Sequence, residues 1–310
     1  MVDGALRACQ ADPALHLLLV GPVEAAGEVL AALDPADRSR VRSIAAPADR
    51  ADLTRVAPPS ERRSRPNRTA GSWVESGVRA AVLAIAQGTA DAVVSAGNTG
   101  ATVASAALGL GRWPGVRRPA LAAVLPTHAG RLVLLDVGSS VDPDEQTLAM
   151  HARLGAAYAR VVHEVDAPRV GLLTIGTERG KGDRLRRAVS AVLDDFDLPA
   201  GGRYVGPVEG NDVVIGEVAD VVVTDGFTGN VLLKGLETAY ALIGPPGGTT
   251  DVPPRAAILL GVSGTVVVCH GAASGTDLAA GIALAAHLHR RAAVEAIRAL
   301  ISGSEVTDEQ

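Results

Sequence analysis

Two stretches of this sequence share one pattern: Ala90-Asp-Ala-Val-Val-Ser-Ala-Gly-Asn-Thr-Gly100 and Ala219-Asp-Val-Val-Val-Thr-Asp-Gly-Phe-Thr-Gly229. In each, Ala-Asp precedes an apolar run, and Gly-x-Thr-Gly leads into a second apolar segment. The first run is typical of a buried parallel strand, and the second segment predicts a helix. A glycine-rich turn between them leaves backbone N–H groups open for a ligand beside the positive end of the helix. Two such loops favour paired binding sites around one cleft, with plain turn chemistry as the alternative.

Composition limits the class of protein. The chain has 310 residues, a formal net charge of −5 and 47% hydrophobic residues, enough for one large or two ordinary domains. Only 2% of the residues are aromatic, which together with the mild acidity argues against a nucleic-acid surface. The sequence has neither an apolar run long enough to span a membrane nor a secretory leader. Cys9 and Cys269 match no metal spacing, so we expect reduced, buried thiols in a cytoplasmic protein.

Lysine is scarce in this chain. Of the 29 basic residues, only Lys181 and Lys234 are lysine, and both have glycine neighbours. One interpretation is codon bias; the other is that these two positions need a compact ammonium group rather than a planar guanidinium. We favour a binding role for Lys181 and leave both interpretations open for Lys234.

Strand and helix signals alternate along the chain and predict a three-layer α/β/α fold with a mostly parallel sheet. Further strands are predicted at residues 15–20, 41–46, 121–125, 131–136, 169–175, 203–208, 258–261 and 265–269. Helices are predicted at residues 1–9, 24–33, 72–87, 101–110, 145–165, 183–195 and 277–301. We expect one domain over residues 1–310, with two lobes around a central cleft as an open alternative, and a disordered tail at 302–310.

Residues 49–69 are rich in Arg, Pro and Ser and predict a flexible basic loop. Such a loop either guides an anionic substrate or is a solvated linker. A third glycine-rich loop, Gly176-Thr-Glu-Arg-Gly-Lys-Gly182, lies between a predicted strand and a predicted helix and carries a cation. It lacks the Gly-Lys-Ser/Thr ending of a nucleotide P-loop, and the chain lacks a dinucleotide fingerprint. We therefore expect no cofactor and no metal.

Several motifs occur in the order found in one known family. They are Ser95-Ala-Gly-Asn-Thr-Gly-Ala101, Leu135-Asp-Val-Gly138, the segment 171–182, Val208-Glu-Gly210, Asp225-Gly-Phe-Thr-Gly-Asn230, Leu260-Gly-Val-Ser-Gly264 and His270-Gly271. Together they make the chain resemble the bacterial acyl-acyl-carrier-protein:phosphate acyltransferases of phospholipid synthesis. The resemblance runs from about Asp3 to Ala286.

The resemblance implies an enzyme that transfers a fatty acyl group from acyl carrier protein to inorganic phosphate, giving acyl phosphate. It also implies a fold like that of phosphate acetyltransferases and isocitrate dehydrogenases. A homodimer is implied as well, in the cytoplasm and peripheral at the inner face of the membrane, beside the downstream acyltransferase.

The chain departs from the family pattern at several places. Family members begin with a strand and an Asp-Ala-Met-Gly-Gly-Asp loop, which this sequence lacks, so we expect an N-terminally short member. Between Glu237 and Ile258 the family carries a long helical insertion associated with dimerisation and membrane contact, and here only residues 244–254 and their flanks remain. Ser140 and Thr174 each stand where the family has asparagine.

The family reaction, attack of phosphate on a thioester, needs phosphate held and partly desolvated, and donors for the developing oxyanion. We predict a catalytic set of Lys181, Asn230, His270 and Asn98. The predicted phosphate- and substrate-binding set is Gly97, Thr99, Gly100, Glu178, Asp225, Gly226, Thr228 and Gly229. The loops and the Lys181 ammonium would hold phosphate, and the two asparagine amides would donate to the oxyanion.

Two of these roles have competing interpretations. His270 either deprotonates or orients phosphate, or is a structural histidine. Asp225 and Glu178 either orient Lys181, or Asp225 only caps the next helix.

Three other functions are weighed against this one. A non-catalytic paralogue would bind acyl carrier protein or phosphate without turnover. A phosphate acetyltransferase-like enzyme would use acyl-CoA. A nicotinamide dehydrogenase is the least favoured, because its fingerprint is absent.

Overall fold

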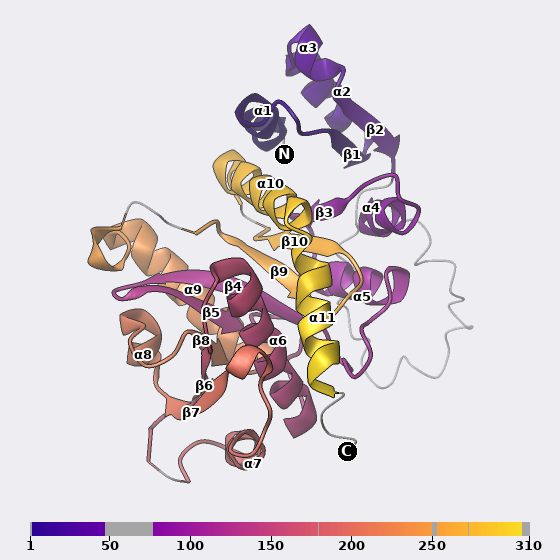
Figure 1. The fold of residues 1–310 in the computed structure, drawn as a ribbon. Helices are drawn as coiled ribbons and strands as arrows, with labels where there is room; N and C mark the ends of the chain where they lie inside the picture. The colour runs from indigo at the N-terminus through magenta and orange to yellow at the C-terminus, as the bar shows by residue number, and fades with distance from the viewer. Residues whose placement is uncertain (1, 47–76, 179, 250–252, 272, 306–310) are drawn as a thin grey trace, which may run out of the picture.

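The computed structural model describes residues 2–46, 77–178, 180–249, 253–271 and 273–305, and Figure 1 shows its ribbon. The predicted basic loop at residues 49–69 lies outside these ranges. Of the predicted tail, residues 302–305 belong to the last helix, α11 (Ala293–Glu305), and residues 306–310 lie outside the described part.

Eight of the described strands form one sheet in the order β3-β10-β9-β4-β5-β8-β6-β7. In that order the strands are β3 (Ala92–Ser95), β10 (Thr265–Cys269), β9 (Ala256–Leu260), β4 (Ala120–Thr127), β5 (Gly130–Leu135), β8 (Val221–Val223), β6 (Arg169–Leu173) and β7 (Arg203–Val208). Neighbours are parallel on both flanks, and the pairs β10–β9, β9–β4 and β4–β5 at the centre are antiparallel. The predicted α/β class is confirmed, as a mixed and mostly parallel sheet.

Helices cover both faces of this sheet and complete the three layers (Figure 1). Side chains of β5 alternate between the faces, as strand geometry requires: Val133 and Leu135 join one core cluster, and Leu132 and Leu134 join the other. The first cluster includes residues of α6 (Glu145–His163), α7 (Arg184–Leu193), α10 (Gly275–Arg290) and α11. The second includes residues of α4 (Gly77–Ala86), α5 (Thr99–Gly109) and α8 (Gly210–Ile215), and partly buried leucines of α9 (Gly226–Ile243) pack against it.

The N-terminal residues form a small unit that packs on α10 (Figure 1). Its elements are α1 (Val2–Ala11), β1 (Leu17–Gly21), α2 (Val23–Ala32), α3 (Pro35–Arg38) and β2 (Val41–Ala45). Within the described residues, β1 and β2 pair only with each other, in parallel, over a separate core that includes Ala5, Cys9, Val29 and Val41.

The predicted final helix at 277–301 is two helices in the structure. The chain turns between α10 and α11 at Ala292, which adopts a left-handed φ of 46°. No glycine or proline marks this break, so the alanine-rich sequence gave no signal for it. The turn lets Val294, Ile297 and Ile301 of α11 reach the core that also buries α6.

The two strands of the shared sequence pattern, β3 and β8, run in opposite directions, as the pairings between them require. Their ends nevertheless stand level with each other. One row of the sheet joins them, each residue paired with the next: Ser95, Val268, Ala257, Ala123, Leu134 and Val222. The chain segments that follow β3 and β8 therefore leave the sheet from the same level, on either side of its antiparallel centre.

A buried carboxylate shapes the segment that follows β5. Asp136 is fully buried, and its two oxygens accept the backbone amides of Leu121, Gly138, Ser139 and Ser140 at 3.0, 3.1, 2.9 and 2.5 Å. These four hydrogen bonds offset part of the lost hydration and fix the loop 136–140, although burial still raises the pKa of Asp136 above its ordinary value.

Helix α9 begins in direct contact with this loop. The Gly226 amide donates to the Ser140 carbonyl at 2.7 Å. A Cβ on Gly229 would lie 2.0 Å from the Asp136 carbonyl oxygen, so only glycine allows the approach. Gly226 and Gly229 are thus required for packing of helix against loop.

This contact makes a matched pair of substitutions informative. We expect Gly229→Ala to destabilise the protein by about 3 kcal/mol or more, because the clash is with backbone that cannot rotate away. Gly235→Ala, on the same helix, meets no atom within 4 Å and should stabilise by about 0.5 kcal/mol, because alanine is the better helix former. Urea denaturation of both variants checks this, and equal stabilities would contradict the proposed close contact.

Candidate functional site

A cavity of about 300 Å³ lies between one face of α9, strand β4 and the adjoining ends of β9 and β10. Most of its lining is apolar, with Leu121, Ala123, Leu125, Val137 and Leu233 among the contributors. The remaining lining residues are Thr99, Val124, Pro126, Asn230, Lys234, Glu237, Tyr240, Pro245, Pro253, Pro254, Arg255, Ala256, Ala257, Val268, Cys269 and His270. A concave apolar site with a few convergent polar groups is the usual form of a small-molecule site.

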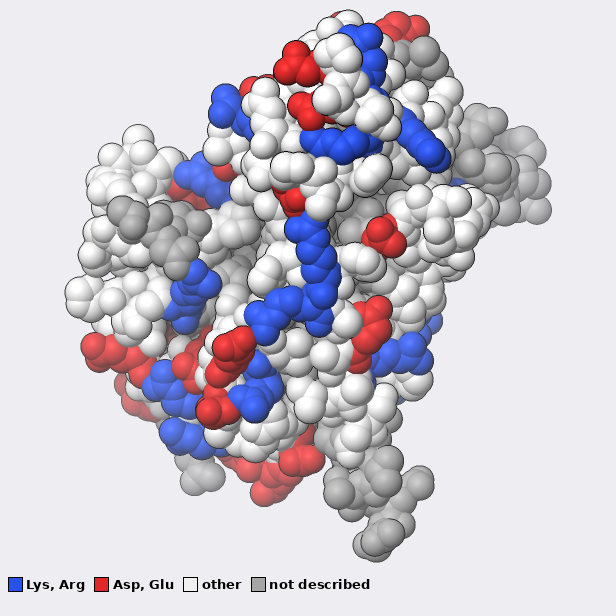
Figure 2. Space-filling model, turned by 45° about the horizontal axis from the view of Figure 1, so that its top comes forward, with Lys and Arg blue, Asp and Glu red and all other residues white. Residues whose placement is uncertain are grey.

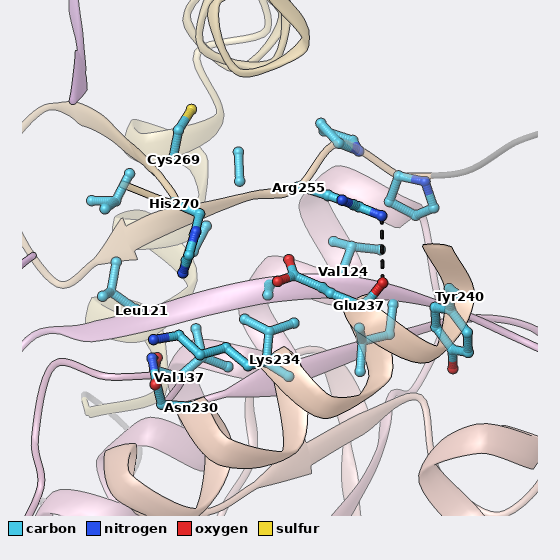
Figure 3. Close-up of a pocket in the computed structure, with 18 of the residues that line it drawn as sticks. Leu121, Val124, Val137, Asn230, Lys234, Glu237, Tyr240, Arg255, Cys269 and His270 are labelled. Atoms are coloured by element: carbon cyan, nitrogen blue, oxygen red, sulfur yellow. Dashed lines mark hydrogen bonds between the residues drawn. The ribbon is translucent and has the colours of Figure 1, made fainter. Parts of the chain in front are cut away.

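Polar groups gather at one end of the cavity. Asn230, Lys234 and His270 lie there, and Figure 3 shows the Lys234 side chain running toward Asn230 and beneath His270. Thr99, the first residue of α5, also lines the cavity. The structure thus brings together Thr99, Asn230 and His270 from three separate predicted motifs.

Helix geometry explains the α9 contribution. Leu233 and Lys234 come three and four residues after Asn230, and Glu237 and Tyr240 follow at intervals of three or four, so all five share one face of the helix. The structure places all of them along the cavity.

The first glycine-rich loop keeps part of its hydrogen-bonding capacity open. Asn98 caps α5 by accepting the Ala101 amide at 2.9 Å, so its carbonyl oxygen serves the helix and not a ligand. The Gly97 amide donates to Ser95 Oγ at 3.3 Å. Among the described residues, none accepts from the amides of Thr99 and Gly100, which form the positive end of the helix.

The second loop is built differently, despite the shared sequence. Asp225 caps α9, so Gly-Phe-Thr-Gly is the first helical turn and not a free turn. The Thr228 amide donates to Asp225 Oδ1 at 2.9 Å and the Gly229 amide to the Asp225 carbonyl at 3.0 Å. The prediction of open amides therefore does not describe Gly226, Thr228 and Gly229, whose amides have partners within the chain. Of the two interpretations of Asp225, the structure shows the helix cap.

Thr228 faces away from the cavity, two residues and about 200° around the helix from Asn230. Its hydroxyl donates to Asp225 Oδ2 at 2.7 Å and accepts from Arg186 Nη2 at 3.2 Å. Arg186 also donates to Thr224 Oγ1 at 3.1 Å and forms ion pairs with Asp225 and Asp183. The Arg186 and Asp225 side chains are only 11% and 8% exposed, so this is a buried pair.

The sequence analysis did not predict the cluster around Arg186, because Arg186 is one of several arginines in a predicted helix. Its only signal was the aspartate three residues earlier, at the cap of α7. Burial on its own would raise the pKa of Asp225, but the hydrogen bonds from Thr228 and Arg186 and the Arg186 charge outweigh it. The pKa of Asp225 is therefore below its ordinary value.

Lys181 and Glu178 lie outside the cavity lining. Their side chains are 50% and 70% exposed, with Lys181 Nζ 3.8 Å from Glu178 Oε2. The structure thus places Lys234, the lysine whose role was left open, at the cavity instead of Lys181.

Glu237 is a further cavity residue that the sequence interpretation missed. It lies one turn after Lys234, and Figure 3 shows its carboxylate between His270 and Arg255. Arg255 Nη2 donates to the Glu237 carbonyl oxygen at 3.4 Å. Burial raises the pKa of Glu237, and the charges of Arg255, His270 and Lys234 offset this only in part. Burial likewise raises the pKa of the Cys269 thiol to about 11, so it is not a ready nucleophile.

On the face shown in Figure 2, acidic and basic side chains both occur, and a run of basic side chains crosses the centre of the face. Within the described ranges, no cluster of three or more His, Cys, Asp or Glu is placed to hold a metal ion. The described helices also include none that is long and apolar enough to cross a membrane.

Comparisons with known proteins identify relatives. A family model described as "Fatty acid synthesis protein" matches residues 1–245. A phosphate acyltransferase of Thermobifida fusca is 42% identical over 245 residues, which cover 71% of this chain and 68% of the relative. A phosphate acyltransferase of Pseudomonas syringae pv. syringae is 37% identical over 300 residues, covering 88% of this chain and 84% of the relative.

Solved structures with the same fold are more distant in sequence. A phosphotransacetylase from Staphylococcus aureus has a TM-score of 0.51 at 15% identity, covering 95% of this chain and 98% of its own. A 4-hydroxythreonine-4-phosphate dehydrogenase from Klebsiella pneumoniae has a TM-score of 0.53 at 15% identity, covering 93% and 94%. These two likenesses establish the predicted fold type and nothing about the reaction.

The buried Arg186–Asp225 pair predicts a large stability effect. Arg186→Ala should cost about 3 kcal/mol, because it leaves the Asp225 carboxylate buried without its cation. Arg184→Ala, an exposed position on the same helix, should change stability by less than about 0.5 kcal/mol. The contribution of Asp225 should be complete above about pH 4 and be lost as the pH falls through its lowered pKa. Urea denaturation across pH checks both statements, and equal costs for the two arginine variants would contradict them.

Proposed function

Because the chain belongs to the phosphate acyltransferase family and is an acyltransferase of fatty acid and phospholipid synthesis, we propose that it transfers a fatty acyl group from the thioester of acyl carrier protein to inorganic phosphate. The observation that carries this proposal is the cavity, which joins an apolar groove to a polar end bearing a lysine, a histidine and an asparagine. The apolar part suits the acyl chain, and the polar end suits phosphate and the thioester carbonyl.

The reaction balances without a protein nucleophile. A phosphate oxygen attacks the carbonyl carbon, the C–O bond forms, and the C–S bond breaks with its electron pair leaving on sulfur. The products are acyl phosphate and the free carrier thiol. When H2PO4⁻ attacks through one of its two P–OH oxygens, the proton of that hydroxyl passes to His270 and then to the departing thiolate, and the other proton stays on the acyl phosphate.

Each polar residue has a role that its position supports. The Lys234 ammonium and the positive end of α5, with the Thr99 hydroxyl, hold phosphate. Asn230 donates one amide hydrogen to the Val137 carbonyl at 2.9 Å, which fixes the side chain and leaves the second hydrogen for the oxyanion. Asn98 positions Thr99 through the α5 cap.

The partners of the enzyme extend this proposal. Acyl carrier protein is the donor, and the enzyme is a cytoplasmic homodimer that reaches the membrane surface peripherally. Exposed apolar side chains on α9 support such contacts: Phe227, Val231, Leu242 and Ile243 are 63%, 59%, 80% and 85% exposed.

The two lysines provide the decisive comparison. Lys234→Ala should lower kcat/KM for phosphate by about 10²–10³-fold, because it removes the cation beside the reacting groups. Lys181→Ala should keep kcat/KM within about threefold of wild type, because its side chain lies outside the cavity. The assay is phosphate-dependent release of carrier thiol, run in parallel with acyl-CoA as donor.

The opposite ranking of the two variants would place phosphate at the 176–182 loop and contradict the cavity assignment. Faster turnover with acyl-CoA than with acyl carrier protein would contradict the proposed donor.

A further inference from the structure

Exposed apolar side chains gather at one edge of the sheet. Among the described residues, seven large apolar side chains are more than half exposed: Leu108, Val141, Ile175, Phe227, Val231, Leu242 and Ile243. Four of these seven follow the carboxyl ends of β5, β8 and β6, which are neighbouring parallel strands. Single exposed apolar residues are ordinary. A group of them at the edge where open α/β sheets bind ligands indicates a contact surface.

Three of the four belong to one patch. The Ser140 carbonyl accepts the Gly226 amide at 2.7 Å, so the residues that follow these two, Val141 and Phe227, start from adjoining backbone. Val231 lies one turn after Phe227 on the same side of α9. The three apolar side chains are 64%, 63% and 59% exposed in chain order. We call Val141, Phe227 and Val231 the apolar rim.

The apolar rim borders the polar end of the cavity. Phe227 comes three residues before Asn230, and so lies one turn from it on α9. Val231 stands in the same relation to Lys234. Asn230 also donates to the Val137 carbonyl at 2.9 Å, in the loop that leads to the rim. The rim residues themselves do not line the cavity, so a ligand group that leaves the polar end on this side passes over them.

The chemistry of the donor indicates which group that is. The carbonyl carbon of a thioester carries its alkyl chain on one side and its sulfur on the other. With the alkyl chain in the apolar groove and the carbonyl at Asn230, the sulfur and all that is attached to it lie at the polar end. On a carrier protein the attachment is a pantetheine arm, which has an apolar dimethyl-substituted carbon and ends in an anionic phosphodiester.

Exposed cations lie near the rim and suit that anion. Arg186 of α7 donates to Thr228 Oγ1 at 3.2 Å, which holds α7 against the first turn of α9. Arg184 and Arg187, on the same helix, are exposed. An arm that crosses the rim toward α7 therefore brings its phosphodiester to two guanidinium groups, the side chains best suited to bind phosphate oxygens.

Resting on the proposed function above, we propose that the apolar rim is the docking surface for the pantetheine arm of the acyl carrier protein. Phe227 provides the largest apolar contact, and Arg184 and Arg187 receive the phosphodiester. A second copy of this chain seated on the rim would close the path by which the arm reaches the carbonyl, so the position of the rim favours the arm as its occupant.

Two donors with the same acyl group test the role of Phe227. One is acyl carrier protein, and the other is the N-acetylcysteamine thioester, which lacks the dimethyl-substituted carbon and the phosphodiester. Phe227→Ala should lower kcat/KM for acyl carrier protein about tenfold, mainly through KM, because it removes apolar contact area. It should change kcat/KM for the short thioester less than about twofold. Equal losses with both donors, or no loss with either, would overturn the proposal.

Matched variants accompany this comparison. Phe227→Leu keeps apolar bulk and should restore most of the activity with acyl carrier protein. Leu108→Ala removes a side chain that is 78% exposed, on α5 and outside both the rim and the cavity lining, and should behave as wild type with both donors. Arg184→Gln combined with Arg187→Gln should raise KM for acyl carrier protein about fivefold at low salt; an unchanged KM would overturn the assignment of the phosphodiester.

The mass in solution tests the other occupant. Wild type and Phe227→Ala should have the same mass by light scattering at equal concentration. A smaller mass for Phe227→Ala would assign the rim to a second copy of the chain and overturn the proposal.

A binding measurement separates this inference from the proposed reaction. Holo carrier protein, which bears the arm, should bind wild type about tenfold more tightly than apo carrier protein, which lacks it, and Phe227→Ala should abolish the difference. If this pattern appears but no acyl phosphate forms with any donor, the proposed function is wrong and the rim assignment stands. If acyl phosphate forms but wild type and Phe227→Ala bind holo carrier protein equally, the rim assignment is wrong and the proposed function stands.

Discussion

The buried carboxylate of Asp136 is the constraint on which the candidate site depends. Taking an ionised group out of water is costly unless hydrogen bonds replace the lost hydration, and here four backbone amides replace part of it. Those same bonds fold the loop 136–140 into a shape that receives the first turn of α9. The Gly226 amide and the bare Cα of Gly229 then bring the helix against the loop backbone. The position of α9, and with it one whole wall of the groove, follows from this contact.

Because the start of α9 is fixed against the loop 136–140, the orientation of the helix about its axis is fixed too, and its two sides face different surroundings. One side presents Asp225 and Thr228 to Arg186, a buried arrangement of one cation with a carboxylate and hydroxyls that ties α9 to α7. The other presents Asn230 and Lys234 to the groove. The structural ion pair therefore holds the helix, while the cation on the opposite side is left to act on a ligand. This division explains why an arginine, whose several N–H donors reach two carboxylates and two hydroxyls at once, stands in the buried cluster, while a lysine stands at the groove.

The sequence predicted the α/β class, most strands, and three of the residues that meet at the cavity, because buried strands and glycine-rich strand ends leave strong local signals. It did not predict which strands are neighbours, and the row from Ser95 to Val222 exists only through those pairings. The shared Gly-x-Thr-Gly pattern also concealed a difference in capping: Asn98 caps α5 within the motif, whereas Asp225 caps α9 before it. The choice between Lys181 and Lys234 rested on neighbouring glycines, which report backbone geometry and not the direction of a side chain. The spacing of Lys234 from Asn230 was the better signal, since it places both on one face of the predicted helix.

The groove has both apolar and charged lining residues, and this combination links binding of the acyl chain to the reaction at the polar end. Glu237 and Arg255 lie along the groove, and Lys234 lies at its polar end. While water fills the groove, it screens the interactions among these charges. An alkyl chain that fills the groove displaces that water, and the low-dielectric surroundings then strengthen the attraction of Lys234 for phosphate and for the developing oxyanion. In the proposed mechanism, the remote apolar contacts thus contribute to the rate at the polar end as well as to binding, as expected when binding energy from non-reacting parts of a substrate lowers the barrier.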